Sequence, residues 1–120
     1  MKKNIGLILA VLIIAGCATM RLYDTLKPNR DNLGKLSIGM TKEQVLDLMG
    51  TKPFVCNNMT IANPFRVSML QGSSQMYEVL YYVVKVVTDD NIIDENELIP
   101  LILVDGKLAG WGWDYLENVR

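Results

Sequence analysis

The chain has 120 residues, of which 12 are Lys or Arg, 13 are Asp or Glu and none is His. This length predicts a single domain, and a net charge of −1 without a basic stretch argues against a nucleic acid partner. The lack of histidine excludes every His-dependent catalytic triad and most zinc sites. Glycine motifs that bind phosphates or dinucleotides do not occur. The sequence therefore predicts no enzyme, no cofactor and no metal site.

The N-terminus has the features of an export signal that ends in a cysteine. Lys2 and Lys3 precede an apolar run, residues 5–15, which is shorter than the about 20 residues needed to cross a bilayer. The letters IAGC, which end at Cys17, resemble the bacterial lipobox: a branched apolar residue, two small residues, then a cysteine that is acylated, with the chain cut just before it. We therefore expect residues 1–16 to be a signal peptide and Cys17 to be the lipidation site.

Acylation at Cys17 predicts where the protein works. Several acyl chains on one cysteine suffice for stable attachment to a membrane, whereas a single chain binds only marginally. The next residue is Ala18, and an aspartate at that position would favour the inner membrane, so we expect the periplasmic face of the outer membrane. Lipidation leaves Cys56 without a disulfide partner, either as a small buried hydrophobe or as an exposed free thiol.

The mature chain divides into a tether and a domain. Residues 17–30 show no sustained hydrophobic period and are predicted to be a lipidated tether, while residues 31–120 form the folded domain. The clearest helix signal covers Lys42 to Met49, because Thr41 and Gln44 have the spacing of a capping box. The helix carries an apolar stripe of Val45, Leu48 and Met49, and it ends at Gly50. A further short helical turn is expected within residues 29–36.

Strand signals dominate the second half of the chain. Residues 65–71 and 76–88 are predicted strands, and both faces of the second are largely apolar, as in a central strand. Residues 98–104 and 107–114 flank Asp-Gly, a strong hairpin signal, whereas residues 56–64 are expected to form a loop. The fold class is α+β, with one or two short N-terminal helices packed on an antiparallel sheet of three to four strands.

Two stretches are candidate binding sites. Residues 88–98 are acidic, but an EF-hand alignment that ends at Glu97 places Val86 at the first ligand position, so no structural calcium is expected there. On a strand, Trp111 and Trp113 would share one face, and Gly110 and Gly112 would let another segment approach the other face. The tryptophans are either core residues or, with Phe65, candidate contacts for a partner.

The order of these pieces resembles a known family. The lipobox, the tether, the segment LSIGMTKEQVLDLMGTKP and a tight hairpin VDGKL are similar to the SmpA/OmlA (BamE-like) family of small outer-membrane lipoproteins, as a divergent branch. The resemblance implies two helices on a three-stranded antiparallel sheet, and the family includes an accessory subunit of the machinery that inserts β-barrels into the outer membrane. It therefore implies envelope proteins, including the barrel-assembly machinery, as partners.

These observations predict a non-enzymatic interaction module, anchored in the outer membrane by the lipid on Cys17, that acts in outer-membrane assembly or maintenance. The alternative is an inhibitor or regulator of a periplasmic hydrolase. Such an inhibitor would insert loop residues such as Asn57, Asn58 and Met59 into a concave site. An assembly factor would instead offer a flatter face of the sheet or of a helix.

Overall fold

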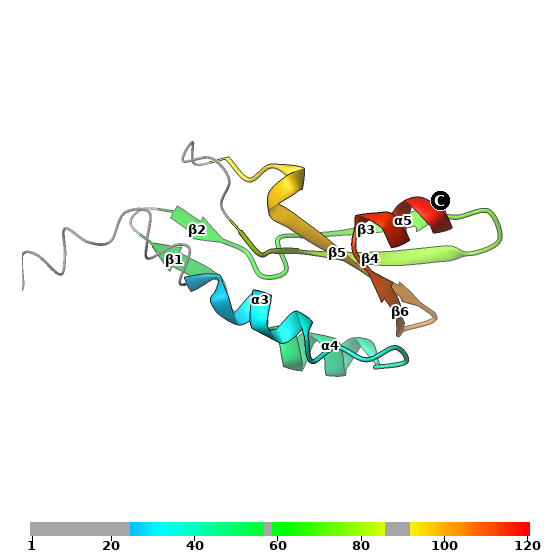
Figure 1. The fold of residues 1–120 in the computed structure, drawn as a ribbon, viewed down its shortest axis with the longest axis horizontal. Coiled ribbons are helices and arrows are strands. Elements are labelled where there is room, and N and C mark those ends of the chain that lie inside the picture. Colours follow the sequence, from blue (N-terminus) through cyan, green and yellow to red (C-terminus); the bar gives the residue numbers. More distant parts are fainter. Residues whose placement is uncertain (1–24, 57–58, 86–91) are drawn as a thin grey trace, which may run out of the picture.

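The computed structural model describes residues 25–56, 59–85 and 92–120. The elements follow in the order α3 (Lys27–Leu33), α4 (Lys42–Met49), β1 (Phe54–Cys56), β2 (Met59–Ile61), β3 (Arg66–Gln71), β4 (Met76–Val83), the 3₁₀ helix η1 (Glu95–Glu97), β5 (Leu98–Val104), β6 (Lys107–Trp111) and α5 (Trp113–Val119). Strands β3, β4, β5 and β6 form one antiparallel sheet in chain order, and β1 pairs with β2 in a separate hairpin (Figure 1). The α+β prediction is confirmed, although α5 follows the strands instead of preceding them.

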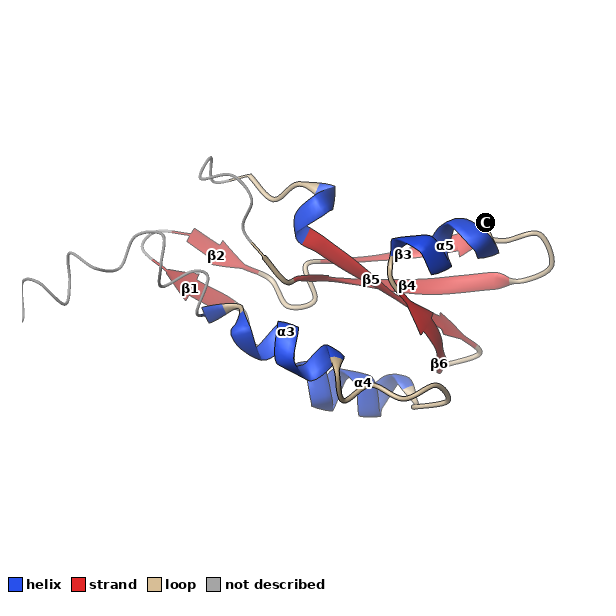
Figure 2. Ribbon diagram, in the orientation of Figure 1, coloured by secondary structure: helices blue, strands red, loops and turns tan. Residues whose placement is uncertain are grey.

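The four-stranded sheet is covered on both faces. Helix α5 lies on one face and α4 on the other (Figures 1 and 2), which we name the α5 face and the α4 face. Side chains of β4 alternate between them, as a strand requires. Those in the α5-face core are Tyr77, Val79, Tyr81 and Val83, and those in the α4-face core are Leu80 and Tyr82. A largely apolar central strand is thus confirmed. It ends at Val83, and residues 86–88 of the predicted strand lie outside the described residues.

Helix α4 has the predicted bounds because its local signals are satisfied. The Gln44 backbone N–H donates to Thr41 Oγ1 at 3.2 Å, and the Thr41 N–H donates to Gln44 Oε1 at 2.9 Å, which completes the capping box. At its end Gly50 has φ of 90°, a conformation that favours glycine. Val45 and Met49 are buried against the α4 face.

Replacing Thr41 with alanine should lower the free energy of unfolding by about 1 kcal/mol, because the Gln44 N–H loses its acceptor. Denaturant unfolding of the two proteins measures the difference. The matched control is Thr51→Ala, which makes the same change at an exposed loop position and should alter stability by less than about 0.5 kcal/mol. Equal losses in the two variants would show that the cap is not the cause.

The folded domain begins earlier than the sequence indicates. Helix α3 starts at Lys27 with Pro28 in its first turn, where proline is well tolerated. Leu26 is fully buried in the α5-face core, and Asn29 is fully buried as well. The predicted boundary at residue 30 therefore falls inside a helix, and the tether can include only residues before Leu26. Residues 17–24 lie outside the described part.

The segment predicted as a loop at residues 56–64 is partly a strand. Met59–Ile61 pairs antiparallel with Phe54–Cys56, with Ile61 opposite Phe54. Ile61 is buried in the α5-face core. This burial stabilises β2, which is too short to be recognised from its sequence pattern alone.

The aromatic stretch near the C-terminus is not a continuous strand. Gly112 has φ of 98° and precedes the first residue of α5, Trp113. The chain therefore turns between the two tryptophans, and the prediction that they share a face is wrong. Trp111 packs with the α4-face core and Trp113 with the α5-face core. The expectation of a close approach holds at Gly110, where the Tyr115 ring of α5 covers the strand.

Replacing Gly110 with alanine should lower the free energy of unfolding by about 1–3 kcal/mol, because the new Cβ would lie 2.6 Å from the Tyr115 ring and displace it. The matched control is Gly34→Ala. Gly34 has φ of −69° and its nearest neighbour to a new Cβ lies at 3.5 Å, so this change should be neutral or slightly stabilising. A tolerated Gly110→Ala, measured by thermal unfolding, would contradict the packing of α5 on β6.

Candidate functional site

The two edges of the four-stranded sheet differ. The outer edge of β6 is covered by the segment between α3 and α4, whose Gly39 N–H donates to Leu108 O at 2.7 Å. The Leu108 N–H donates to Met40 O at 2.7 Å, and the Lys42 N–H donates to Gly106 O at 2.8 Å. This segment satisfies backbone groups that an edge strand otherwise exposes. The edge at β6 is therefore covered at Leu108 and at the adjoining turn.

The opposite edge, at β3, is open within residues 25–56, 59–85 and 92–120. β3 is joined to β4 by a tight turn in which the Gly72 N–H donates to Gln75 O at 2.8 Å. Backbone groups in an antiparallel ladder alternate between the two sides of a strand. Counted from that turn, Val67, Met69 and Gln71 direct their N–H and C=O groups away from β4. An open edge of this kind is a template for a further strand.

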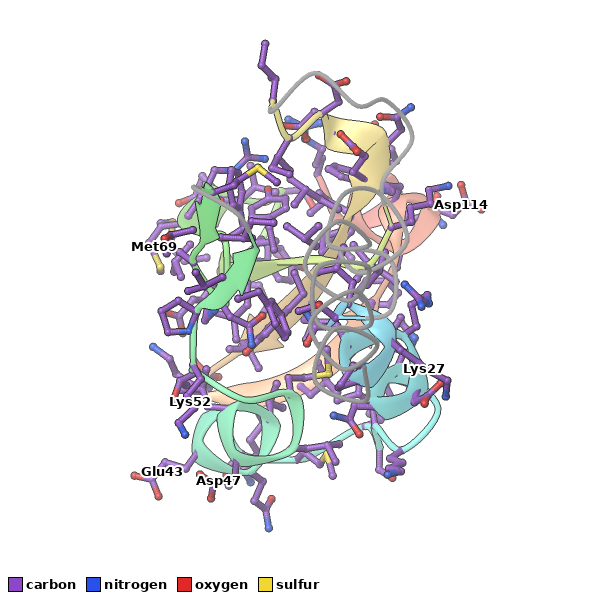
Figure 3. The ribbon with its side chains drawn as sticks, turned by 90° about the vertical axis from the view of Figure 1, so that its left-hand side faces the viewer. Lys27, Glu43, Asp47, Lys52, Met69 and Asp114 are labelled. Carbon is purple, nitrogen blue, oxygen red and sulfur yellow. The ribbon has the colours of Figure 1, made fainter. Side chains whose placement is uncertain are left out.

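Apolar side chains accompany this open edge on the α4 face. Val67 is 51% exposed, Met69 61% and Met76, beside them on β4, 47%. Figure 3 shows Met69 at the outside of the molecule, pointing away from the sheet. We name the outer edge of β3 together with Val67, Met69 and Met76 the β3 surface. Clustered exposed apolar side chains typically mark interaction sites, whereas single ones do not.

The charges that border the β3 surface are already paired. Lys42 Nζ of α4 lies 2.9 Å from Glu78 Oε2, next to Met69. On the α5 face, Arg66 lies 2.8 Å from a Glu95 oxygen and 4.1 Å from the centre of the Tyr81 ring. The hydrogen bond with Glu95 raises the pKa of the Arg66 guanidinium above its ordinary value. A partner can therefore cover the apolar side chains without burying an unpaired charge from either ion pair.

The candidate contacts taken from the sequence do not form one site. Phe65 and Trp113 are half-buried against the α5-face core, and Trp111 is half-buried against the core on the opposite face. The Trp113 Nε1–H donates to Leu98 O at 3.0 Å, so its polar atom serves the fold. Val67, Met69 and Met76 are not among the contact residues that the sequence predicts. Within β3 the exposed residues Val67 and Met69 lie on the α4 face, and this exposure follows from the edge position, which the sequence of the strand does not report.

The other predicted positions are placed as follows. Cys17, Asn57 and Asn58 lie outside the described residues, and Met59 is half-buried against the α5-face core, so it does not extend freely as an inhibitor loop would. Of the acidic stretch, Glu97 is fully buried and accepts a hydrogen bond from the Asp94 N–H at 2.8 Å. Residues 86–91 lie outside the described part.

A second polar feature ties α3 to the sheet. The Asn29 side-chain amide donates to Asn63 Oδ1 at 3.0 Å and to Val83 O at 2.9 Å. Asn63 donates in turn to Gly50 O at 3.1 Å, and the Tyr82 hydroxyl donates to the same oxygen at 3.2 Å. Burial raises the pKa of Tyr82 to about 12, which keeps the hydroxyl available as a donor. These residues join α3, the end of α4 and the end of β4.

Neither a metal cluster nor a membrane-spanning helix is found among the residues that the structure describes. No three His, Cys, Asp or Glu side chains there are grouped so that they could hold a metal ion. None of the helices in these segments has the length and apolar character needed to cross a bilayer.

The fold and the site define a small α+β protein with one covered and one open edge on a four-stranded antiparallel sheet. A family model described as a protein of unknown function (DUF3192) matches residues 10–118, and the chain therefore belongs to the DUF3192 family. No curated protein matches the chain, and no solved structure does.

Proposed function

We propose that this protein is a lipoprotein, anchored by acyl chains on Cys17 to the periplasmic face of the outer membrane. There it acts without catalysis, as an interaction module in outer-membrane assembly or maintenance. The observation that carries the interaction role is the contrast between the edges of the sheet, because the protein covers β6 and leaves β3 open beside Val67 and Met69.

The location rests on sequence features. The basic N-terminus, the short apolar run and the IAGC motif favour export and lipidation, and the residue after Cys17 favours the outer membrane. The resemblance of residues 36–113 to BamE-like lipoproteins supports a role beside the barrel-assembly machinery. A folded domain on a short tether suits contact with proteins near the membrane surface.

Site-specific photocrosslinking in intact cells tests the interaction role. A crosslinking side chain at Met69 should capture an envelope protein, whereas the same group at Glu43 should not. Glu43 is exposed on α4 and points away from the body of the molecule (Figure 3). Capture of barrel-assembly subunits from Met69 supports an assembly role. Capture of one soluble hydrolase defeats it, and equal labelling from Met69 and Glu43 shows that β3 is not an interaction surface.

A further inference from the structure

We propose that the β3 surface binds a second copy of this chain, through antiparallel pairing of the two β3 strands about a two-fold axis at Ser68. This inference rests on the proposed function only in treating the β3 surface as a site for protein contact. In this arrangement a second copy of the chain occupies the β3 surface. The pairing joins two four-stranded sheets into one continuous sheet.

The pattern of β3 is self-complementary in this register. A two-fold axis perpendicular to the sheet joins each face with the same face of the second copy. With the axis at Ser68, Val67 stands opposite Met69 of the second copy, and Met69 stands opposite its Val67. Both residues expose more than half of their side chains on the α4 face, and such cross-strand apolar pairs stabilise a sheet. The same register joins the backbone groups of Val67 and Met69 that point outward.

Charge does not oppose this pairing. Arg66 is the charged residue of β3, and the register places it opposite Leu70 of the second copy, away from the second Arg66. Arg66 is paired with Glu95, and the neighbouring Lys42 is paired with Glu78. Like charges directly opposite each other would destabilise the sheet, and the register contains none within the strand.

The size of the surface predicts a weak dimer. A stable interface buries about 800 Å² on each partner from roughly 20–30 residues, and a six-residue strand with Met76 offers less. Confinement at a membrane compensates by raising the effective concentration of one copy near another. The nine Cα-to-Cα steps from Cys17 to Leu26 reach at most about 32 Å, which keeps each domain near the bilayer. A two-fold axis normal to the membrane places both anchors at the same level.

Disulfide trapping tests the pairing in the full-length protein, expressed in its own cell envelope with Cys17 intact and Cys56 replaced by serine. At the axis, the Ser68 positions of the two copies form a non-hydrogen-bonded pair with Cα atoms about 4.5 Å apart, within disulfide range. The variant Ser68→Cys should therefore give a disulfide-linked dimer on a non-reducing gel. Val67→Cys is the matched control, because in this register its two Cα atoms lie about 8 Å apart, outside that range.

Random collision predicts the opposite order, because Val67 is exposed and Ser68 is half-buried. A dimer from Val67→Cys that equals or exceeds that from Ser68→Cys would overturn the inference. A second measurement uses charge exchange at exposed positions that leave the core intact. In the Ser68→Cys protein, Met69→Glu alone should reduce the linked dimer about fivefold or more, and adding Val67→Lys should restore it through cross-strand ion pairs. Absence of rescue would also count against the register.

The outcomes separate this inference from the proposed function. If Ser68→Cys gives no dimer while Met69 photocrosslinks to a different envelope protein, the inference that a second copy binds the β3 surface is wrong. The proposed interaction role then stands. If Met69 crosslinks to lipid alone, both are wrong, because the β3 surface then faces the membrane. If Ser68→Cys gives a dimer and Met69 crosslinks to the same chain, pairing between copies is supported.

Discussion

Replacing Cys17 with alanine should remove the protein from the outer-membrane fraction and abolish incorporation of labelled palmitate. The physical reason is the loss of all acyl chains, since each buried CH₂ contributes about 0.8 kcal/mol to membrane binding. In the described residues no helix could replace the anchor. The precursor should remain uncut or appear as a soluble protein. Fractionation of cells that express each variant, followed by fluorography of the labelled protein, measures both effects.

The matched control for this prediction is Cys56→Ala, which removes the other cysteine and leaves the lipobox intact. It should retain the label and the membrane location of the unmodified protein. If palmitate incorporation persists in Cys17→Ala and is lost in Cys56→Ala, the lipidated residue is Cys56, which contradicts our proposal. Unchanged fractionation of both variants would show that lipid does not anchor the protein.

The parts of the fold that were predictable depend on local chemistry. The bounds of α4 follow from Thr41, Gln44 and Gly50, whose roles are set by residues within one or two turns of each other. The hairpin at Asp105-Gly106 is similar, because both residues adopt positive φ at the turn itself. In each case the signal and the structure that it specifies lie within the same dozen residues.

The parts that were not predictable depend on residues distant in the sequence. Whether β3 is an edge is decided by the order of four strands, and nothing within residues 66–71 reports that order. The strand β2 exists because Ile61 is buried by residues far along the chain. Trp113 was misplaced for a different reason, since Gly112 is compatible with a strand and its positive φ was not anticipated. The candidate site therefore required the tertiary structure.

The start of the folded domain near Leu26, earlier than predicted, also depends on contacts with residues distant in the sequence. Residues 25–30 carry no clear hydrophobic period, yet Leu26 and Asn29 are both fully buried. Asn29 is fixed there by acceptors on Asn63 and Val83, which lie 34 and 54 residues away. A polar residue in a segment without a clear hydrophobic period is normally assigned to the surface, and only the three-dimensional arrangement of its partners identifies it as part of the core.

Replacing Asn29 with aspartate should therefore lower the stability of this domain more than Thr41→Ala or Gly110→Ala does. The substitution is nearly isosteric, but it removes both donated hydrogen bonds and directs a carboxylate oxygen at Asn63 Oδ1 and Val83 O. Asn29 Oδ1 already has no hydrogen-bond partner among the described residues. An uncompensated buried charge costs about 3–5 kcal/mol, a large share of the roughly 5–15 kcal/mol that stabilises a typical domain.

The pH dependence identifies the buried charge as the cause. Burial favours the protonated acid, so the folded-state pKa of the introduced carboxyl should lie above its unfolded value of about 3.9. As the pH rises past about 4, the unfolded state loses its proton first, and stability falls until the pH passes the folded-state pKa. Relative to the unmodified protein, the deficit of Asn29→Asp should be smaller at pH 4, where the acid can still donate one hydrogen bond, than at pH 7 in urea unfolding.

The matched control lies three residues further along the same helix. Asn32 is half-buried and its side-chain amide donates to Leu48 O at 3.0 Å. Asn32→Asp therefore makes the same chemical change where water can still solvate the charge, and its loss of stability should be smaller and depend less on pH. If the two variants lose equal stability, or if the deficit of Asn29→Asp does not change between pH 4 and pH 7, the residue is not buried as described. The attachment of α3 to the sheet would then have to depend on Leu26 rather than on the Asn29 hydrogen bonds.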